Sequence, residues 1–228
     1  MSLGGVHIIK QSNKVNSASV IFLHGSGDTG KGILNWIQFL LGDFSLPHIN
    51  FYFPTAPLRP YTPLQGELSN VWFDRYSITP DVPEHKETLD EAGGEIRSLI
   101  QKIGDGGIPQ NRIIIGGFSM GGALALHTAY RFNPGLAGVF TLSSFLNDQS
   151  AIFSEAKSLE TPLYMCHGDR DTLVPISWGQ KTYKDLTQLG INAEFVPIKN
   201  TLHELKRQEI KDLFDWIQKI LPPQESDR

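Results

Sequence analysis

A serine at a sharp strand–helix junction carries the clearest chemical signal in this sequence. Ser119 lies in the pattern Gly117-x-Ser119-x-Gly121, after the β-branched run 113–115 and before the helix-forming segment 123–130. Glycines at these two positions let a strand and a helix approach closely, and the order strand, turn, helix is typical of a nucleophile elbow. The pattern therefore predicts a nucleophilic serine. For this segment alone, a glycine-rich turn that only packs closely is the alternative interpretation.

A serine hydroxyl is a poor nucleophile near neutral pH, so it needs a base and a carboxylate that orients the base. Among the seven histidines, His203 alone follows both the serine and an acidic turn, where the last predicted helix opens, and it is the predicted base. The turn 168–175 offers two carboxylates. Asp171 lies past the bend and is favoured as the acid, whereas Asp169, at the strand end, is the alternative.

Short apolar runs alternate with helical patterns along most of the chain. Strands are predicted at residues 6–10, 19–23, 49–53, 113–115, 136–142, 162–166 and 192–198, and helices at 32–41, 89–103, 123–130, 176–189 and 205–221. This alternation predicts an α/β fold, with a mostly parallel central sheet and helices on both faces. The carboxyl ends of such strands carry the chemistry, and the serine, the acidic turn and His203 all follow strands. His24 and His167 precede glycines at two strand ends, where a histidine can simply hydrogen-bond a loop.

Length and composition limit the class of protein. With 228 residues, the chain is long enough for one α/β domain, 1–228, and short for two. Its net charge of −4 does not indicate a polyanionic partner, so we expect no nucleic acid. The sequence has no run of 18 apolar residues, no signal segment and a single cysteine, Cys166. We expect a cytoplasmic enzyme or binding domain without a stable membrane anchor.

Several motifs together resemble those of the acyl-protein thioesterase and lysophospholipase-like family of α/β-hydrolases, over nearly the full length of the chain. The shared motifs are HGSGD at 24–28, PTAP at 54–57, WFD at 72–74, GFSMGG at 117–122, HGDRD at 167–171 and His203. The resemblance implies an α/β-hydrolase fold. It also implies that Ser119 is the nucleophile, Asp171 the acid and His203 the base, in agreement with the assignment from chain order and turn.

Catalysis of this kind needs two backbone N–H groups directed at the position where negative charge develops. One is expected from Met120, which follows the nucleophile, and the other from Ser26, in the loop after the second predicted strand. Acyl-protein thioesterases typically have glutamine and leucine at these two places, and here the chain is more similar to the lysophospholipase-like members. Backbone donors survive such changes, but the small polar Ser26 alters the rim of the acyl site. We therefore expect a shallower acyl site than in long-chain thioesterases.

The segment 57–83 is long, rich in proline and aromatic residues, and without a sustained period. Its large apolar side chains are Tyr61, Leu64, Trp72, Phe73 and Tyr76. A loop of this length in a compact domain is usually functional, so we expect it to cover the site, with Trp72 as a substrate contact. Phe73 and Tyr76 are expected in a satellite core instead. By family analogy, Leu173 is a further wall of the substrate pocket.

These features predict a serine hydrolase that cleaves acyl thioesters or esters through an acyl-enzyme on Ser119, with no metal or cofactor. The expected substrate is an acylated protein or a small acyl ester. The first alternative is a carboxylesterase or lysophospholipase that prefers short acyl chains, with the same chemistry on a different leaving group. The second is a non-catalytic hydrolase-fold protein that binds acylated partners, which the intact set of serine, acid and histidine disfavours.

Overall fold

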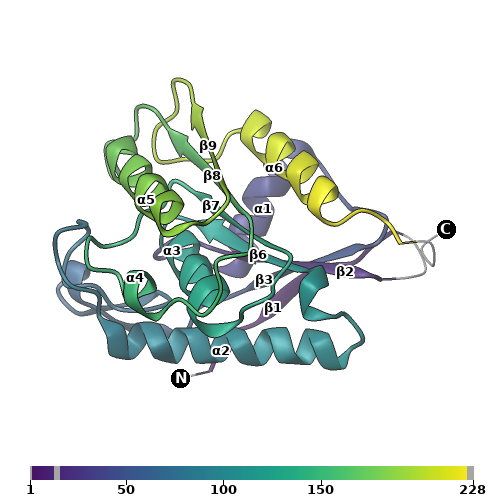
Figure 1. The fold of residues 1–228 in the computed structure, drawn as a ribbon, viewed down its shortest axis with the longest axis horizontal. Coiled ribbons are helices and arrows are strands. Elements are labelled where there is room, and N and C mark those ends of the chain that lie inside the picture. Colours follow the sequence, from purple (N-terminus) through teal and green to yellow (C-terminus); the bar gives the residue numbers. More distant parts are fainter. Residues whose placement is uncertain (1, 13–15, 225–228) are drawn as a thin grey trace.

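The computed structural model describes residues 2–12 and 16–224, and strands alternate with helices along it (Figure 1). The strands are β1 (Val6–Ile9), β2 (Ala18–Leu23), β3 (Ile49–Pro54), β4 (Leu58–Tyr61), β5 (Glu67–Asn70), β6 (Ile113–Phe118), β7 (Gly138–Leu142), β8 (Leu163–Gly168) and β9 (Ala193–Ile198). The α-helices are α1 (Gly30–Leu41), α2 (Lys86–Asp105), α3 (Met120–His127), α4 (Ile152–Glu155), α5 (Ile176–Leu189) and α6 (Arg207–Ile220). Three short turns of other helix types are η1 (Thr62–Leu64), η2 (Gln110–Arg112) and η3 (Thr128–Phe132).

Seven of these strands form the central sheet, in the order β1-β3-β2-β6-β7-β8-β9. β1 runs antiparallel to β3 at one edge, and every other neighbouring pair is parallel. The mostly parallel sheet predicted from the sequence is therefore confirmed. Since β2, β6, β8 and β9 point the same way, the loops that follow them leave from one edge of the sheet, where they can bring functional groups together.

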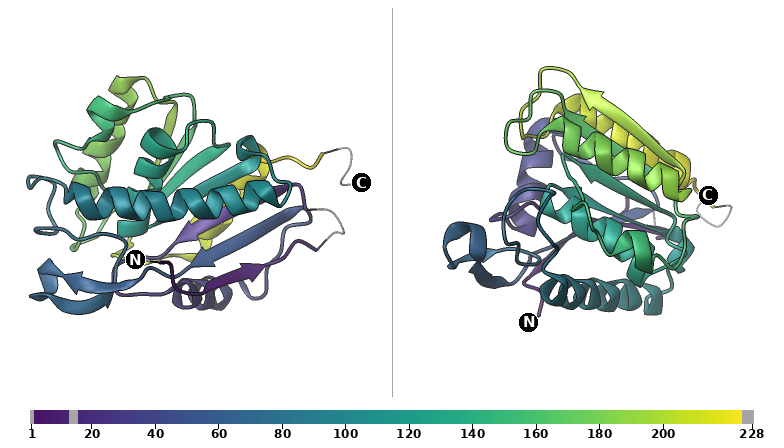
Figure 2. Two further views of the ribbon diagram at one scale, coloured as in Figure 1. Left: turned by 90° about the horizontal axis from the view of Figure 1, so that it is seen from below. Right: turned by 60° about the vertical axis from the view of Figure 1, so that its left-hand side comes forward.

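Helices cover both faces of the sheet, as the two views of Figure 2 show. Ile113 and Ile115 of β6 belong to the core shared with α2 and α3, whereas Ile114 belongs to the core shared with α1 and α6. Successive side chains of a strand point to opposite faces, so a strand covered on both sides must be apolar throughout. This is the physical reason for the continuous apolar runs of β2 and β6.

The segment 57–83 contains a β-hairpin that the sequence analysis did not predict. β4 and β5 pair antiparallel, with Tyr61 opposite Glu67, and η1 forms part of the turn between them. The expectation of a segment without regular structure is therefore wrong. Each strand has only four residues, and Pro60 in β4 has no N–H to donate, which weakens the strand signal. The hairpin lies at the periphery, apart from the central sheet (Figure 2).

Candidate active site

Ser119 lies between β6 and α3 in a backbone conformation that serine rarely adopts. Its φ is 52° and its ψ is −119°, and its N–H donates to the carbonyl oxygen of Leu142 over 2.8 Å. A positive φ at a non-glycine residue stores strain, as in a nucleophile elbow. A Cβ on Gly117 would lie 2.5 Å from the carbonyl oxygen of Leu23, and one on Gly121 would lie 2.4 Å from the same atom. The predicted need for glycine at both positions is confirmed.

The acid and the base favoured from the sequence are in direct contact. Nδ1 of His203 lies 2.7 Å from Oδ2 of Asp171, whose side chain is completely buried. The other carboxylate oxygen, Oδ1, accepts hydrogen bonds from the N–H groups of Leu173 at 3.0 Å and Val174 at 2.8 Å. The turn that follows β8 therefore holds the carboxylate in place, and the carboxylate orients the imidazole. Asp169, the alternative acid, is exposed and makes no such contact among the described residues.

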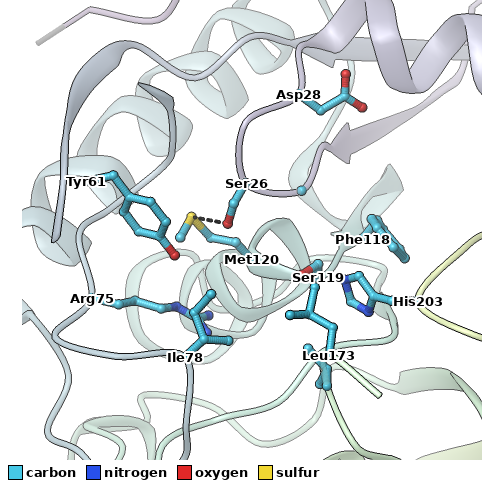
Figure 3. A pocket seen from close by; sticks show the side chains of 12 residues that line it. Ser26, Asp28, Tyr61, Arg75, Ile78, Phe118, Ser119, Met120, Leu173 and His203 are labelled. Atoms are coloured by element: carbon cyan, nitrogen blue, oxygen red, sulfur yellow. Dashed lines mark hydrogen bonds between the residues drawn. The ribbon is translucent and has the colours of Figure 1, made fainter. Parts of the chain in front are cut away.

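His203 lies in the loop between β9 and α6, with Nδ1 of its ring toward Asp171. Its ring packs against Phe118 with centroids 4.7 Å apart. Ser119 and His203 line the same cavity and lie side by side in Figure 3. α6 begins only at Arg207, so the expectation that His203 opens the last helix is wrong. The imidazole therefore reaches the cavity from a loop rather than from the helix.

The loops that carry the acid and the base are joined by their backbones. The N–H of Arg170 donates to the carbonyl oxygen of Thr201 over 3.0 Å. A Cβ on Gly168 would lie 2.5 Å from that oxygen, so glycine is needed for the loops to come this close. Nε2 of His167 lies 2.7 Å from the carbonyl oxygen of Val174, in the same acidic turn. The prediction that His167 hydrogen-bonds a loop is confirmed.

The two residues predicted to provide the oxyanion hole line the same cavity as Ser119. The Ser26 hydroxyl donates to the sulfur of Met120 over 3.6 Å, which joins the two segments (Figure 3). Met120 is the first residue of α3, so its N–H has no acceptor within the helix. The loop that carries Ser26 is fixed by a hydrogen bond of 3.0 Å from the N–H of Gly27 to the carbonyl oxygen of Asn70.

Trp72 is a support of this loop rather than a wall of the cavity. It is 1% exposed, and its side chain is not among those that line the cavity. Its indole N–H donates to the carbonyl oxygen of His24 over 2.8 Å, because a buried indole needs an acceptor. Nε2 of His24 accepts from the N–H of Ala56 over 3.0 Å, so the role expected for His24 in holding a loop is confirmed. The prediction that Trp72 contacts the substrate is corrected accordingly.

A cavity of about 160 Å³ opens beside Ser119 (Figure 3). It is smaller than most ligand pockets, which measure roughly 300 to 1,000 Å³. Leu173, 52% exposed, lies at its rim, where family analogy placed it, and Tyr61 of β4 forms another wall. Arg75 and Ile78 also line it, although neither was predicted.

The segment that carries Arg75 has no periodic pattern from which its path could be predicted. Its path depends on Asp74, whose carboxylate accepts hydrogen bonds from the N–H and the hydroxyl of Thr62 over 2.8 and 2.6 Å. Phe73 is buried as expected, but Tyr76 is 55% exposed, so its assignment to a satellite core is wrong. A basic residue directly after the aromatic motif 72–74 is the one signal that could have directed attention to Arg75.

Other sources of chemistry are limited in the part of the chain that the structure describes. Burial raises the pKa of the Cys166 thiol, which makes it a poor source of thiolate. Among residues 2–12 and 16–224, no group of three or more His, Cys, Asp or Glu side chains could hold a metal ion. Over the same residues, no helix combines the length and apolar character needed to cross a membrane.

The model of the phospholipase/carboxylesterase family matches residues 5–221. The chain belongs to this family. It is 46% identical to mouse lysophospholipase-like protein 1 over 211 residues, which covers 91% of this chain and 88% of the relative. It is 37% identical to acyl-protein thioesterase 1 homolog 2 of Dictyostelium discoideum, over 93% of this chain and 96% of that protein.

The structural comparison agrees with the family assignment. The crystal structure of Arabidopsis thaliana SOBER1 matches with a TM-score of 0.81 at 28% identity, over 90% of this chain and 99% of that one. The predicted α/β-hydrolase fold is confirmed, as is the resemblance to acyl-protein thioesterases and lysophospholipase-like proteins. As a member of this family, the protein is a serine hydrolase that acts on acyl ester or thioester bonds.

Proposed function

We propose that the protein hydrolyses short-chain acyl esters and thioesters, with Ser119 as nucleophile, His203 as general base and Asp171 as the acid that orients it. The observation that carries this proposal is the 2.7 Å contact between Nδ1 of His203 and Oδ2 of Asp171, beside a serine on a strained strand–helix turn. The contact requires a proton on Nδ1, which leaves the lone pair of Nε2 free to accept the serine proton.

In the first half of the reaction, Oγ of Ser119 attacks the acyl carbonyl carbon while His203 takes the hydroxyl proton. The N–H groups of Met120 and Ser26 stabilise the negative charge that develops on the carbonyl oxygen. His203 then gives its proton to the departing alcohol or thiol, and an acyl-enzyme remains on Ser119. Asp171 stabilises the imidazolium ion throughout this step.

In the second half, a water molecule replaces the leaving group beside His203. The imidazole takes a proton from this water, which attacks the acyl carbon, and the same N–H groups again stabilise the oxyanion. Collapse of the tetrahedral intermediate returns the proton to Ser119 and releases a carboxylic acid. The imidazole faces the position of the leaving group and of the water in turn, so one residue serves both halves.

The cavity supports a preference for short acyl groups. An apolar cavity of about 150 Å³ holds a molecule the size of benzene, so a cavity of about 160 Å³ accommodates roughly six carbon atoms. Tyr61, Arg75 and Ile78 line the side remote from His203 (Figure 3). A palmitoyl chain would need these side chains to move. We therefore favour the short-chain carboxylesterase interpretation over long-chain depalmitoylation.

A second hollow supports a separate position for the leaving group. It measures about 360 Å³, adjoins His203, and is lined on one side by Phe118 and by Trp36 of α1, which is 43% exposed. We propose that the leaving alcohol or thiol, which takes its proton from His203, lies in this hollow. Because the hollow is open, we propose that an acylated protein or a small acyl ester in the cytoplasm can serve as substrate.

Active-site labelling tests the proposal. A fluorophosphonate probe should label the protein once, at Ser119, and Ser119→Ala should abolish both labelling and hydrolysis of an acetyl thioester. Ser26→Ala is the matched control, because its backbone N–H remains and labelling should persist. Labelling at Ser143 or Ser144 instead, or hydrolysis that survives Ser119→Ala, would contradict the assignment.

A further inference from the structure

Arg75 is a buried cation that lines the cavity without a direct contact to an anion among the described residues. It is 7% exposed and lines the cavity that contains Ser119. Among the described residues, its guanidinium makes no direct ion pair or hydrogen bond, and Nε is completely buried without an acceptor. Glu84 attracts the charge without contacting it. Burying an unpaired charge is costly, since the group loses its hydration. A retained cation of this kind indicates that a partner arrives from outside the chain.

The aromatic rings around Arg75 attract its charge but do not replace that partner. The guanidinium carbon lies over the ring of Phe73, 5.1 Å from the centroid, and over that of Phe145, 4.8 Å from the centroid. Such contacts attract a cation through the face of the ring. They satisfy none of the five N–H donors of a guanidinium, which lie in its plane. Of the three nitrogens only Nε is sealed from solvent, so the two terminal NH₂ groups can meet an acceptor that enters the cavity.

The neighbouring carboxylates are engaged elsewhere. Both oxygens of Asp74 accept hydrogen bonds from the turn after β4. Glu84 binds His127 over 2.9 Å and also accepts from the backbone N–H of residue 151. Asp28 lines the cavity as well, but Figure 3 places it at the opposite end from Arg75. The donors of Arg75 are therefore left for a ligand.

A second buried donor points to the same place. The hydroxyl of Tyr61 is buried and lies near the Ser26 hydroxyl, which itself donates to the sulfur of Met120. In Figure 3 the Tyr61 hydroxyl and the Arg75 guanidinium both extend from the same side toward the middle of the cavity, with Ile78 beside them. A planar guanidinium next to a phenol hydroxyl is suited to a carboxylate, which can accept from both.

We propose that Arg75 and Tyr61 bind a carboxylate at the far end of the acyl group. The protein then prefers acyl groups derived from short dicarboxylic acids over apolar acyl groups of the same length. The volume of about 160 Å³ suits acyl groups of about four to six carbon atoms. This inference rests on the proposed function, because it assumes that the acyl group attached to Ser119 occupies the cavity.

Matched thioesters of N-acetylcysteamine test it: succinyl against butanoyl, glutaryl against pentanoyl, and adipoyl against hexanoyl. The kcat/KM of each is measured after subtraction of the rate without enzyme, because a free carboxylate can attack its own thioester intramolecularly. We expect the acid-ended substrate to be favoured in at least one pair. In Arg75→Met its kcat/KM should fall by about 10- to 100-fold relative to the apolar partner, as for a lost charge-assisted hydrogen bond.

Further variants separate recognition from structural support. Arg75→Lys keeps the charge but loses the planar pair of donors, so it should retain part of the preference. Tyr61→Phe removes one neutral donor and should reduce the preference only severalfold, roughly as expected for a neutral hydrogen bond. Arg97→Met is the matched control, because Arg97 is exposed on α2 and does not line the cavity, so the ratio within each pair should not change.

If Arg75→Met does not fold, inhibition of the wild-type protein tests whether the cavity binds a carboxylate. Free glutarate and adipate should then inhibit hydrolysis of the acetyl thioester more strongly than pentanoate and hexanoate do. Faster hydrolysis of the apolar substrate in every pair, with no stronger inhibition by the dicarboxylates, would overturn the inference. Absence of acetyl thioester hydrolysis would instead overturn the proposed function.

Discussion

Replacement of Asp171 by asparagine should disable His203 while leaving the turn intact. The carboxylate oxygens have separate partners, since Oδ1 accepts from the N–H groups of Leu173 and Val174 and Oδ2 contacts Nδ1 of His203. An asparagine keeps one oxygen for the turn and places its NH₂ group where Oδ2 lies. Nδ1 of His203 must then accept a hydrogen bond. Nε2 consequently carries the proton and cannot take one from Ser119.

The expected effect is large on kcat and small on stability. In serine triads this change of tautomer lowers kcat by about 10⁴, which corresponds to about 5.4 kcal/mol of transition-state stabilisation. The hydrogen bonds of the turn survive and one charge-assisted bond is weakened, so the free energy of unfolding should fall by about 1 to 2 kcal/mol. KM should change little, because no wall of the cavity is altered. Esterase kinetics with p-nitrophenyl acetate and urea denaturation measure the two effects.

Asp169→Asn is the matched control for this prediction. Asp169 lies two residues earlier, is exposed, and does not line the cavity. Its variant should keep kcat within about threefold, as is usual for a surface change away from the reacting groups. A folded Asp171→Asn protein with a tenth or more of wild-type kcat would refute the reasoning, and so would an Asp169→Asn protein with the larger loss.

Stability and substrate range provide three further tests. Burial raises the pKa of Glu209 from 4.5 to about 7. The stability that the protonated carboxyl group contributes to the fold is therefore present in full below about pH 4.5 and is lost as the pH rises through 7. Glu209→Gln should therefore raise the free energy of unfolding at pH 8 by about 3 kcal/mol, which corresponds to a rise in melting temperature of roughly 6 to 12 °C. At pH 4 the melting temperature should change little, and equal shifts at the two pH values would contradict this explanation. Gly121→Ala, with a Cβ 2.4 Å from a carbonyl oxygen, should destabilise by about 3 kcal/mol or more in urea denaturation. Gly94→Ala, with no atom within 4 Å, should instead stabilise α2 by about 1 kcal/mol, and similar losses in both would argue against the packing explanation. Along p-nitrophenyl esters from acetate to decanoate, kcat/KM should rise about three- to fourfold per carbon and stop near six carbons, whereas a steady climb to decanoate would indicate an open tunnel.

Features that depend on local chemistry could be predicted from the sequence. The inner strands of the sheet, such as β2 and β6, are covered on both faces, so they are mostly apolar and could be recognised from their composition. The elbow could be recognised for a similar reason, because the backbone carbonyl of Leu23 leaves no room for a side chain at Gly117 or Gly121. The chain order of Ser119, the acidic turn and His203 followed from the order of the strand ends.

Features that depend on contacts between distant segments required the tertiary structure. The turn favoured Asp171 but left Asp169 open as the alternative, and the approach of the His203 loop, 32 residues further along the chain, distinguishes them. Trp72 has the composition of a pocket wall, but the carbonyl oxygen of His24 holds its indole beneath the loop. A side chain's environment depends on all the elements packed around it, whereas sequence spacing describes only the element to which that side chain belongs.

Arg75 illustrates the same limit at the cavity. In the sequence it is one basic residue after an aromatic motif, and its default interpretation is a solvated surface charge. The hydrogen bonds of Asp74 with the turn after β4 direct the segment inward, and the guanidinium then lies over the rings of Phe73 and Phe145. Sequence alone therefore determined the fold class and predicted a serine, an acid and a histidine as the reacting groups, because these depend on local composition and chain order. The tertiary structure determined which charged side chains are buried and which groups they face, because burial is a property of the assembled fold.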